Sequence, residues 1–294
     1  MTVRERGFLL LSSHMGEPNR KVLTTVQMRV LAERVRTMEI PDEDRDLTPR
    51  DLMDLGYGPE MADRIHRLLR EEDVLDYYLR KGDVLDCVPV TRVSESYPLY
   101  LRKRLGLDST GVLWARGDRS LLEQPMVALV GSRELRQENW EFAAEVGRQA
   151  ARQGYVLVSG NARGADRTAQ ESCLAAGGRV ISVVADELWK HPLRENVLYL
   201  SEDDYEAGFS AQRALSRNRV IHGLGLKTFV AQATLHSGGT WDGTVKNLQN
   251  RWSDAYGFDD GSDAMAELAQ MGLELIGIKD LDDFYNLPTV NTLI

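Results

Sequence analysis

Residues 155–170 read YVLVSGNARGADRTAQ, and this stretch combines an apolar run, a tight turn and the start of a helix. The run at 155–158 is short and apolar, which predicts a strand that is buried on both faces. Residues 165–176 then have the pattern of a helix. A buried strand followed directly by a helix is the repeating unit of a parallel sheet with right-handed crossovers. The turn between them places Arg163 among small residues, which raises the question of what this arginine binds.

The same alternation begins at about residue 110 and continues along the chain. Short runs rich in Val, Leu and Ile are separated by helical stretches, and Gly154 and Gly177-Gly178 stand where helix C-caps are needed. We therefore predict an α/β fold with a doubly wound, mainly parallel sheet. The predicted strands are 112–115, 126–130, 155–158, 180–184, 228–231 and 273–278, and the predicted helices are 138–153, 165–176, 209–222 and 242–253.

The first part of the chain lacks this alternation, and its pattern predicts a smaller helical region. Thr24–Gln27 resembles a capping box, and Thr48-Pro49 has the form of an N-cap followed by proline, so a helix is expected to begin at each. Residues 55–65, LGYGPEMADRI, resemble a helix-hairpin-helix whose backbone amides meet a DNA phosphate. A plain helix-turn-helix packing unit is the alternative. We divide the chain into an N-terminal helical region, residues 1–110, and a sheet domain, residues 111–294.

The composition is that of a globular protein, and the 294 residues carry a formal charge of −9 at pH 7. This net negative charge argues against a broadly basic surface that coats nucleic acid. An anion site must therefore be formed by a few arginines at specific positions. Cys87 and Cys173 form no CxxC and cannot build a disulfide framework. The run Phe8–Leu11 is too short for a signal peptide or a membrane span. We therefore expect a cytoplasmic protein without a membrane partner.

Small residues and arginines follow three of the predicted strands. The carboxyl ends of parallel strands meet at one edge of a sheet, where ligands of such folds bind. Glycine lets backbone N–H groups approach a phosphate closely, helix N-termini favour negative charge, and arginine matches phosphate oxygens. The turn around Arg163 is therefore interpreted as an anion site, with Asp166 holding that arginine in place or favouring the helix N-terminus. The three loops are Gly131-Ser132-Arg133, Ser159–Gly164 and Ser237–Thr240, the last opening a helix at Asp242.

Four motifs in this order resemble the DNA-processing protein DprA family, also called Smf. They are VALVGSR (127–133), LVSGNARGAD (157–166), LSRNRVIHGL (215–224) and SGGTWDGT (237–244), within a resemblance that covers roughly residues 45–255. The resemblance implies a Rossmann-like domain related to Lonely Guy and lysine-decarboxylase-like proteins, binding to single-stranded DNA, and a homodimer that helps to load RecA. With the loops above, the predicted phosphate-binding residues are Gly131, Ser132, Arg133, Ser159, Gly160, Arg163, Gly164, Asp166, Arg217, Asn218, Arg219, Ser237, Gly238, Gly239 and Thr240.

The sequence also departs from the family pattern. The usual GID motif reads Gly164-Ala165-Asp166, and AYGFDDGSD (255–263) replaces the apolar strand expected after Trp252. No winged helix is expected after Ile278. These differences indicate a divergent member and favour a phosphoribosyltransferase as partner, in a phage-defence or toxin–antitoxin pair. The other expected partner is a RecA-like recombinase, which the resemblance to the family implies. The stretch 264–278 predicts a helix and an edge strand, which favours a homodimer through the sheet domain.

Some of these residues have a purely structural interpretation as well. Arg213 and Arg217 share one face of the predicted helix and Arg219 points elsewhere, so all three could pair with the acidic run Glu202–Asp204 on a solvated surface. Trp241 stacks on a base or packs in the core. Both alternatives stay open at the level of sequence.

Signals for catalysis are weak. The five histidines are scattered without HExxH or Cys/His spacing, and there is no GxSxG, so we predict no catalytic residue, metal or cofactor. A Lonely Guy-like phosphoribohydrolase needs the motif PGGxGTxxE, whose glutamate acts as the acid or base. Here Ser237 replaces the proline, and Lys246-Asn247 occupy the place of the glutamate. Asp242 is a weak substitute for that carboxylate. We predict a non-enzymatic, single-stranded DNA-binding protein. The alternatives are a nucleotide-binding sensor and that phosphoribohydrolase, using the same pocket.

Overall fold

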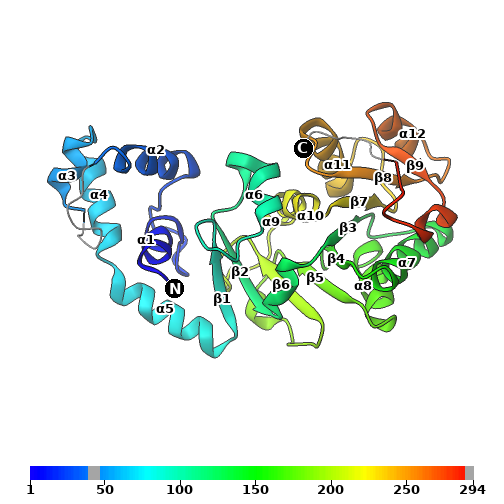
Figure 1. The fold of residues 1–294 in the computed structure, drawn as a ribbon, viewed down its shortest axis with the longest axis horizontal. Coiled ribbons are helices and arrows are strands. Elements are labelled where there is room, and N and C mark those ends of the chain that lie inside the picture. The colour runs from blue at the N-terminus through cyan, green and yellow to red at the C-terminus, as the bar shows by residue number, and fades with distance from the viewer. Residues whose placement is uncertain (39–46, 289–294) are drawn as a thin grey trace.

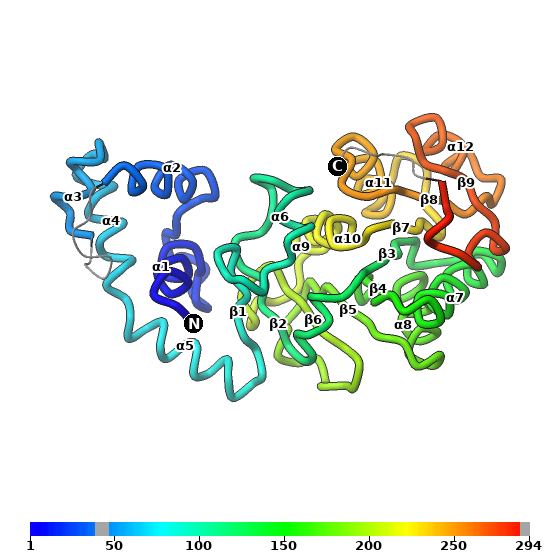
Figure 2. The backbone as a smooth tube through the Cα atoms, viewed as in Figure 1, coloured from blue at the N-terminus to red at the C-terminus, as the bar shows by residue number. Residues whose placement is uncertain are grey.

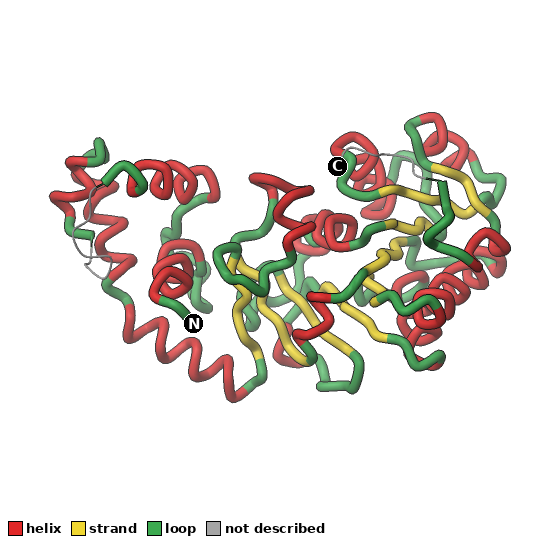
Figure 3. Tube along the Cα trace, in the orientation of Figure 1, coloured by secondary structure: helices red, strands yellow, loops and turns green. Residues whose placement is uncertain are grey.

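The computed structural model of this protein describes residues 1–38 and 47–288, which form an elongated molecule with a helical end and a sheet-containing body (Figure 1). No helix in these two ranges is long and apolar enough to cross a membrane. Figure 3 separates the helices at one end from the strands in the middle of the molecule. The helices of the first end are α1 (Val3–Ser12), α2 (Thr25–Val35), α3 (Pro49–Asp54), α4 (Pro59–Leu69) and α5 (Glu72–Val84).

The N-terminal helices begin where the sequence predicts. The Thr24 hydroxyl accepts from the N–H of Gln27, and the Gln27 side chain accepts from the N–H of Thr24, which is a complete capping box. Thr48 and Asp51 form the same reciprocal pair at α3. The stretch 55–65 forms the turn between α3 and α4 and most of α4, whose apolar face packs into a small core of its own. That core contains Leu11, Leu23, Leu31, Leu52, Ala62, Ile65 and Leu68.

A nine-stranded sheet forms the body, in the order β1-β2-β6-β5-β4-β3-β7-β8-β9. The pairs β1–β2 and β2–β6 are antiparallel and all others are parallel. The predicted α/β fold with a mainly parallel sheet is therefore confirmed. The strands are β1 (Cys87–Thr91), β2 (Val112–Gly117), β3 (Met126–Val130), β4 (Val156–Ser159), β5 (Arg179–Val183), β6 (Val197–Ser201), β7 (Lys227–Val230), β8 (Asp254–Phe258) and β9 (Glu274–Ile276).

Helices cover both faces of the sheet, and the interior strand β3 is buried along its whole length. Val127 and Leu129 join one core with α7 and α8, whereas Ala128 and Val130 join the opposite core with α10. This two-sided burial explains why the strand is a continuous apolar run. The remaining helices are α6 (Leu99–Leu105), α7 (Gln137–Arg152), α8 (Ala165–Ala175), α9 (Ala211–Ser216), α10 (Asn218–Leu224), α11 (Gly238–Asn250) and α12 (Asp263–Gln270), with 3-10 turns at Gly106–Asp108, Arg119–Glu123, Leu188–Lys190 and Ile278–Asp282.

Three strands were not predicted from the sequence. β1 contains Pro89, which the sheet tolerates because β1 is an edge strand whose partner, in the part of the chain that the structure describes, is β2 alone. β8 shows that a strand does follow Trp252, and its Gly257 is needed because a Cβ there would lie 2.4 Å from the Leu273 side chain. β6 has the pattern of a buried strand and was overlooked. β1 lies within residues 1–110 but belongs to the sheet. The division of the chain at residue 110 stays a prediction.

Two helices also differ from their predicted ranges. The stretch 209–222 was predicted as one helix, but the structure divides it at Arg217 into α9 and α10. The helix predicted to open at Asp242 begins at Gly238 instead, so most of the SGGT motif belongs to the first turn of α11. Both differences place site residues at helix ends, where backbone groups lack partners within the helix. The path of the backbone through these junctions is followed most easily in Figure 2.

His222 on α10 offers a test of the packing between α10 and α11. The side chain is completely buried, and burial lowers its pKa from 6.5 to about 3. The unfolded chain takes up a proton near pH 6.5 and the folded chain does not, so acidification favours unfolding by about 1.4 kcal/mol per pH unit between these values. We expect His222→Leu to remove this dependence. Urea unfolding across this pH range measures it, with the exposed His14→Leu as control, and parallel slopes for both variants would contradict the prediction.

Candidate nucleic-acid interface

Backbone contacts join the loops that follow β3, β4 and β7, as the sequence predicts for the carboxyl edge of the sheet. The N–H of Ala165 donates to the carbonyl of Ser132 over 3.2 Å, and the N–H of Ser132 donates to the carbonyl of Gln232 over 3.0 Å. Gly164 has a φ of +83°, and a Cβ there would lie 2.4 Å from the carbonyl oxygen of Arg133. Only glycine allows this approach, so the small residues serve to bring two loops together.

A cavity of about 480 Å³ opens at this edge of the sheet. Its arginines come from the loop after β3, the loop after β4, the first turn of α8 and the α9–α10 junction. Arg133, Arg163 and Arg167 are exposed, and the side chain of Arg163 is 71% exposed with one weak contact, 3.4 Å to Glu134. These three cations are therefore available to a ligand. The lining residues are Arg133, Asn161, Ala162, Arg163, Arg167, Ala185, Asp186, Phe209, Ala214 and Arg217.

Arg217 has a different role, because its side chain is only 11% exposed. Its guanidinium donates to the carbonyl of Val183 over 2.9 Å and lies 3.7 Å from the carboxylate of Asp166. It also crosses Gly160 so closely that a Cβ at that glycine would lie 1.6 Å from an arginine nitrogen. The arginine therefore ties the β4 loop to the end of β5 and forms one wall of the cavity.

Asp166 binds Arg217 and not Arg163, which differs from one of the two roles expected for it. Its carboxylate also accepts from the N–H of Ala162 over 3.2 Å, so it closes the turn at the start of α8. Burial raises the pKa of this carboxyl, and the neighbouring Arg217 and the Ala162 N–H oppose the shift. A carboxylate this deeply buried is stable only beside a cation, so the pair acts as one unit.

Ser159 lies beneath the cavity and does not line it. Its hydroxyl is fully buried and accepts a hydrogen bond of 2.7 Å from Gln170, which also reaches the Ser182 hydroxyl at 3.3 Å. The residue therefore supports the β4 loop from inside the fold. Its neighbour Gly160 is also buried.

Arg219 points away from the cavity and pairs with Glu202 at 2.5 Å. Arg213 pairs with Asp203 at 2.5 Å and donates to the carbonyl of Ala185. The structural interpretation left open at the level of sequence therefore describes these two arginines, whereas Arg217 faces the cavity. The structure does not bring Arg219 together with Arg133 and Arg163.

The SGGT motif lies beside α10 rather than in the cavity. The Asn218 amide donates to the carbonyl of Gly239 over 2.9 Å and so fixes the first turn of α11. Ser237 and Gly238 are exposed, and Gly239 and Thr240 are half-buried. Trp241 is only 6% exposed and belongs to the core, which leaves no face for a base to stack on. The motif therefore forms the start of α11, and none of its four residues lines the arginine cavity.

Seven of the ten lining residues are absent from the predicted phosphate-binding set: Asn161, Ala162, Arg167, Ala185, Asp186, Phe209 and Ala214. Phe209 is 62% exposed, whereas the other five phenylalanines are buried or half-buried. Asp186 receives a hydrogen bond of 2.8 Å from His191, and this bond lowers the pKa of the carboxyl. The sequence does carry a signal for Arg167, because this residue lies four positions beyond Arg163, in the first turn of the helix that follows the loop.

Fold and site together define an α/β protein with an arginine-lined cavity at the carboxyl edge of a parallel sheet. The family model described as DNA recombination-mediator protein A matches residues 89–251, more than half of the chain. The chain belongs to this family. The resemblance to DprA and Smf seen in the four motifs is thereby confirmed.

Individual relatives agree with this assignment. The chain is 29% identical over 177 residues to the DNA processing protein DprA of Bacillus subtilis, a match that covers 56% of this chain and 57% of that protein, less than two thirds of its length. The solved structure of DprA from Streptococcus pneumoniae superposes with a TM-score of 0.70 at 23% identity and covers 96% of this chain and 97% of the other. DprA of Helicobacter pylori, described for its single-stranded DNA binding mode, has a TM-score of 0.55 at 22% identity and covers 67% and 94%. Both structures share the fold.

The close passage of Arg217 over Gly160 gives a specific test. Gly160→Ala must displace the guanidinium, because the new methyl group would occupy its place. We expect a loss of about 1–3 kcal/mol in the free energy of unfolding, as for other overpacked sites. Denaturant unfolding measures this loss. Gly7→Ala is the matched control, since a Cβ there meets nothing within 4 Å inside α1 and should be neutral or stabilising. Equal stability of the two variants would show that Arg217 is not held as described.

Proposed function

We propose that this protein binds single-stranded DNA through the arginine cavity and acts in DNA processing. The observation that carries the proposal is the convergence of Arg133, Arg163 and Arg167 on one cavity, each exposed and none of them held in a close ion pair within the described residues. Exposed guanidinium groups form charge-assisted hydrogen bonds with phosphate oxygens. In a chain of net charge −9, such a cluster is a local site for an anionic strand.

Phe209 supplies the second element of the proposed interface. Its ring is 62% exposed and lines the same cavity as the arginines. Bases of a single strand stack on aromatic side chains, and this contact is tolerant of sequence because every base has a π-face. Phosphate contacts position a strand without reading its bases. We therefore propose binding with little sequence preference, in which phosphates lie on the arginines and a base on Phe209.

The wider role follows from the family and stays a proposal. A DNA-processing protein of this kind acts in recombination by loading a RecA-like recombinase, or in a phage-defence or toxin–antitoxin pair beside a phosphoribosyltransferase. We also propose a homodimer through the sheet domain. Its support is β9, which within residues 1–38 and 47–288 is an edge strand paired with β8 alone.

Arg163→Ala tests the DNA proposal directly. Affinity for single strands should fall with salt, with a log–log slope of about −0.7 for each phosphate that is neutralised. Because Arg163 is 71% exposed and makes one weak contact, its removal should leave the fold intact. We expect weaker binding to all sequences alike and a slope that is flatter by about 0.7. Fluorescence anisotropy with short labelled oligonucleotides across a salt series measures both quantities.

The control must be an arginine outside the cavity. Arg36 serves this purpose poorly, because it lines a second and larger cavity. Arg80 on α5 is exposed and lines neither cavity, so Arg80→Ala is the charge-matched control and should bind DNA as the unchanged protein does. If Arg163→Ala keeps its DNA affinity and slope but loses binding of a small nucleotide, the DNA proposal fails and a nucleotide sensor replaces it.

The cavity volume supports a nucleotide-binding sensor as the second candidate, because about 480 Å³ is within the range of small-ligand sites. A phosphoribohydrolase is less well supported. Asp242, the only substitute for its missing glutamate, is exposed on α11 and does not line the arginine cavity. A general acid must reach the bond that it protonates. We therefore propose binding without hydrolysis.

Incubation with nucleoside monophosphates tests this distinction, and we expect no release of free base. Chromatography of the products measures the reaction. Turnover that persists through purification and is abolished in Asp242→Ala would contradict the proposal. Asp263→Ala, at the exposed start of α12, is the matched control for loss of a surface carboxylate.

A further inference from the structure

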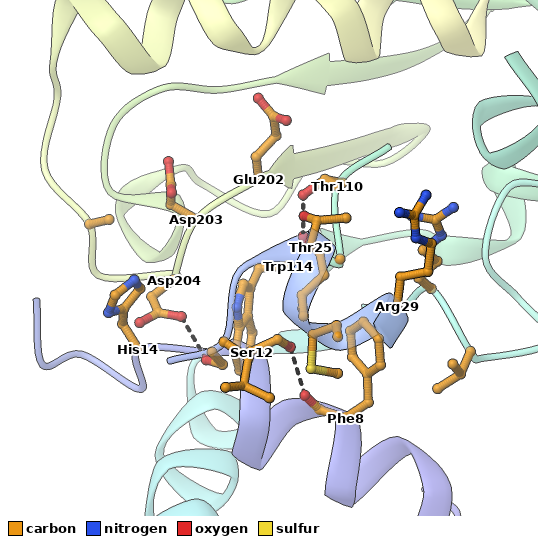
Figure 4. Close-up of a pocket in the computed structure, with 18 of the residues that line it drawn as sticks. Phe8, Ser12, His14, Thr25, Arg29, Thr110, Trp114, Glu202, Asp203 and Asp204 are labelled. Atoms are coloured by element: carbon orange, nitrogen blue, oxygen red, sulfur yellow. Dashed lines mark hydrogen bonds between the residues drawn. The ribbon is translucent and has the colours of Figure 1, made fainter. Parts of the chain in front are cut away.

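A second cavity, of about 780 Å³, lies between the N-terminal helices and the β2 side of the sheet. Phe8 of α1 and Met28 of α2 line it on one side, and Val112 and Trp114 of β2 line it on the other. The two sides touch at Phe8, because a Cβ added to Gly111 would lie 3.3 Å from its ring. Figure 4 shows Phe8 and Trp114 between the acidic residues Glu202–Asp204 on one side and Arg29 on the other. The cavity therefore has an apolar floor and charged walls.

Interactions inside the protein satisfy the acidic wall. Glu202 pairs with Arg219 and Asp203 pairs with Arg213, each at 2.5 Å. Asp204 accepts from the Ser13 hydroxyl at 2.9 Å and from the N–H of Gly16 at 2.8 Å, and Glu206 pairs with Lys81 at 2.6 Å. Burial raises the pKa of Glu202 and of Asp204. Three of these four carboxylates are therefore paired with a cation, and Asp204 is held by neutral donors.

The arginines of the cavity are in the opposite situation. Arg4, Arg92 and Arg102 form no ion pair within the described ranges 1–38 and 47–288, and Arg29 lies 3.7 Å from Glu33 with both side chains exposed. They come from α1, α2, α6 and the turn after β1. The uncompensated charge of this cavity is therefore positive.

We propose that this second cavity binds a nucleotide, with the base against the apolar floor near Phe8 and Met28 and the phosphate on Arg29 and Arg102. An apolar floor with a few cationic groups at its rim is the usual form of such a site. Arginine fits the phosphate, and an aromatic ring fits the base. The ligand is a free nucleotide or one unit of a DNA strand, and these two sources share the same chemistry.

The position of the cavity favours a DNA strand as the source, a choice that rests on the proposed function. Ala207, Gly208 and Arg213 line the second cavity, while Phe209 and Ala214 of the same segment line the first. The two cavities therefore lie on either side of residues 207–214. A strand that leaves the first cavity over Phe209 would enter the second one beside Ala207 and Gly208 and cross its apolar floor to reach Arg29 on the other side. A longer strand would then contact both the sheet and the N-terminal helices.

The test compares the double variant Arg29→Ala/Arg102→Ala with Arg80→Ala, all three residues being exposed arginines. Thermal unfolding first establishes that the variants fold equally well. Anisotropy is then measured with labelled oligothymidylates of about four nucleotides and of about sixteen, and calorimetry with dAMP. We expect the double variant to bind the long strand about tenfold more weakly, with a salt slope flatter by about 1.4, and to bind the short strand normally.

Each outcome separates the two sites. Loss of dAMP binding with unchanged long-strand affinity supports the nucleotide site and identifies free nucleotide as its source. Unchanged affinity for both long strand and dAMP, relative to Arg80→Ala, overturns the proposal. A separate measurement detects failure of the first site. In that case Arg163→Ala binds the short strand with normal affinity. If the protein binds no DNA, the dAMP measurement alone tests whether the second cavity binds a nucleotide.

Discussion

The buried pair of Arg217 and Asp166 is the interaction on which the candidate site depends. It joins the α9–α10 junction to the first turn of α8, and the hydrogen bond from Arg217 to the Val183 carbonyl adds the end of β5. Removal of one partner from a buried pair leaves the charge of the other buried and uncompensated. This destabilises the fold by more than an exposed ion pair stabilises it. The glycine at 160 follows from this pair, because the guanidinium occupies the space of its side chain. The loop that presents Arg163 therefore keeps its shape without help from Arg163 itself.

Ion pairing divides the arginines of this acidic protein into two groups. Arg213 and Arg219 are held by the carboxylates of residues 202–203 and stabilise the segment after β6. Arg133 and Arg163 are exposed at the edge of the sheet, where Gly164 lets the two loops that carry them approach closely. Net charge alone therefore says little about local binding, since a cavity acts through those charges that the fold leaves uncompensated.

The segment after β6 also connects the two ends of the molecule. Tyr205 stacks on Tyr78 of α5 with ring centroids 4.5 Å apart and meets Trp114 of β2 edge-on at 4.9 Å. Asp204 accepts hydrogen bonds from the loop after α1. A few residues further on, the same segment supplies Phe209 to the arginine cavity. The N-terminal helices are thus attached to the sheet through the segment that carries part of the site.

The sequence by itself determined the α/β class, the capped starts of α2 and α3, and the loops at the carboxyl edge, because apolar periodicity and glycine or threonine placement report local geometry. It also placed Arg163 in the correct turn. Only the tertiary structure decided that Arg219 pairs with Glu202, that Trp241 is buried, and that Phe209 is exposed in the cavity. The direction of a side chain depends on which distant segments pack around it. Such packing arises from contacts between residues far apart in the chain, and the pattern of one segment does not record it.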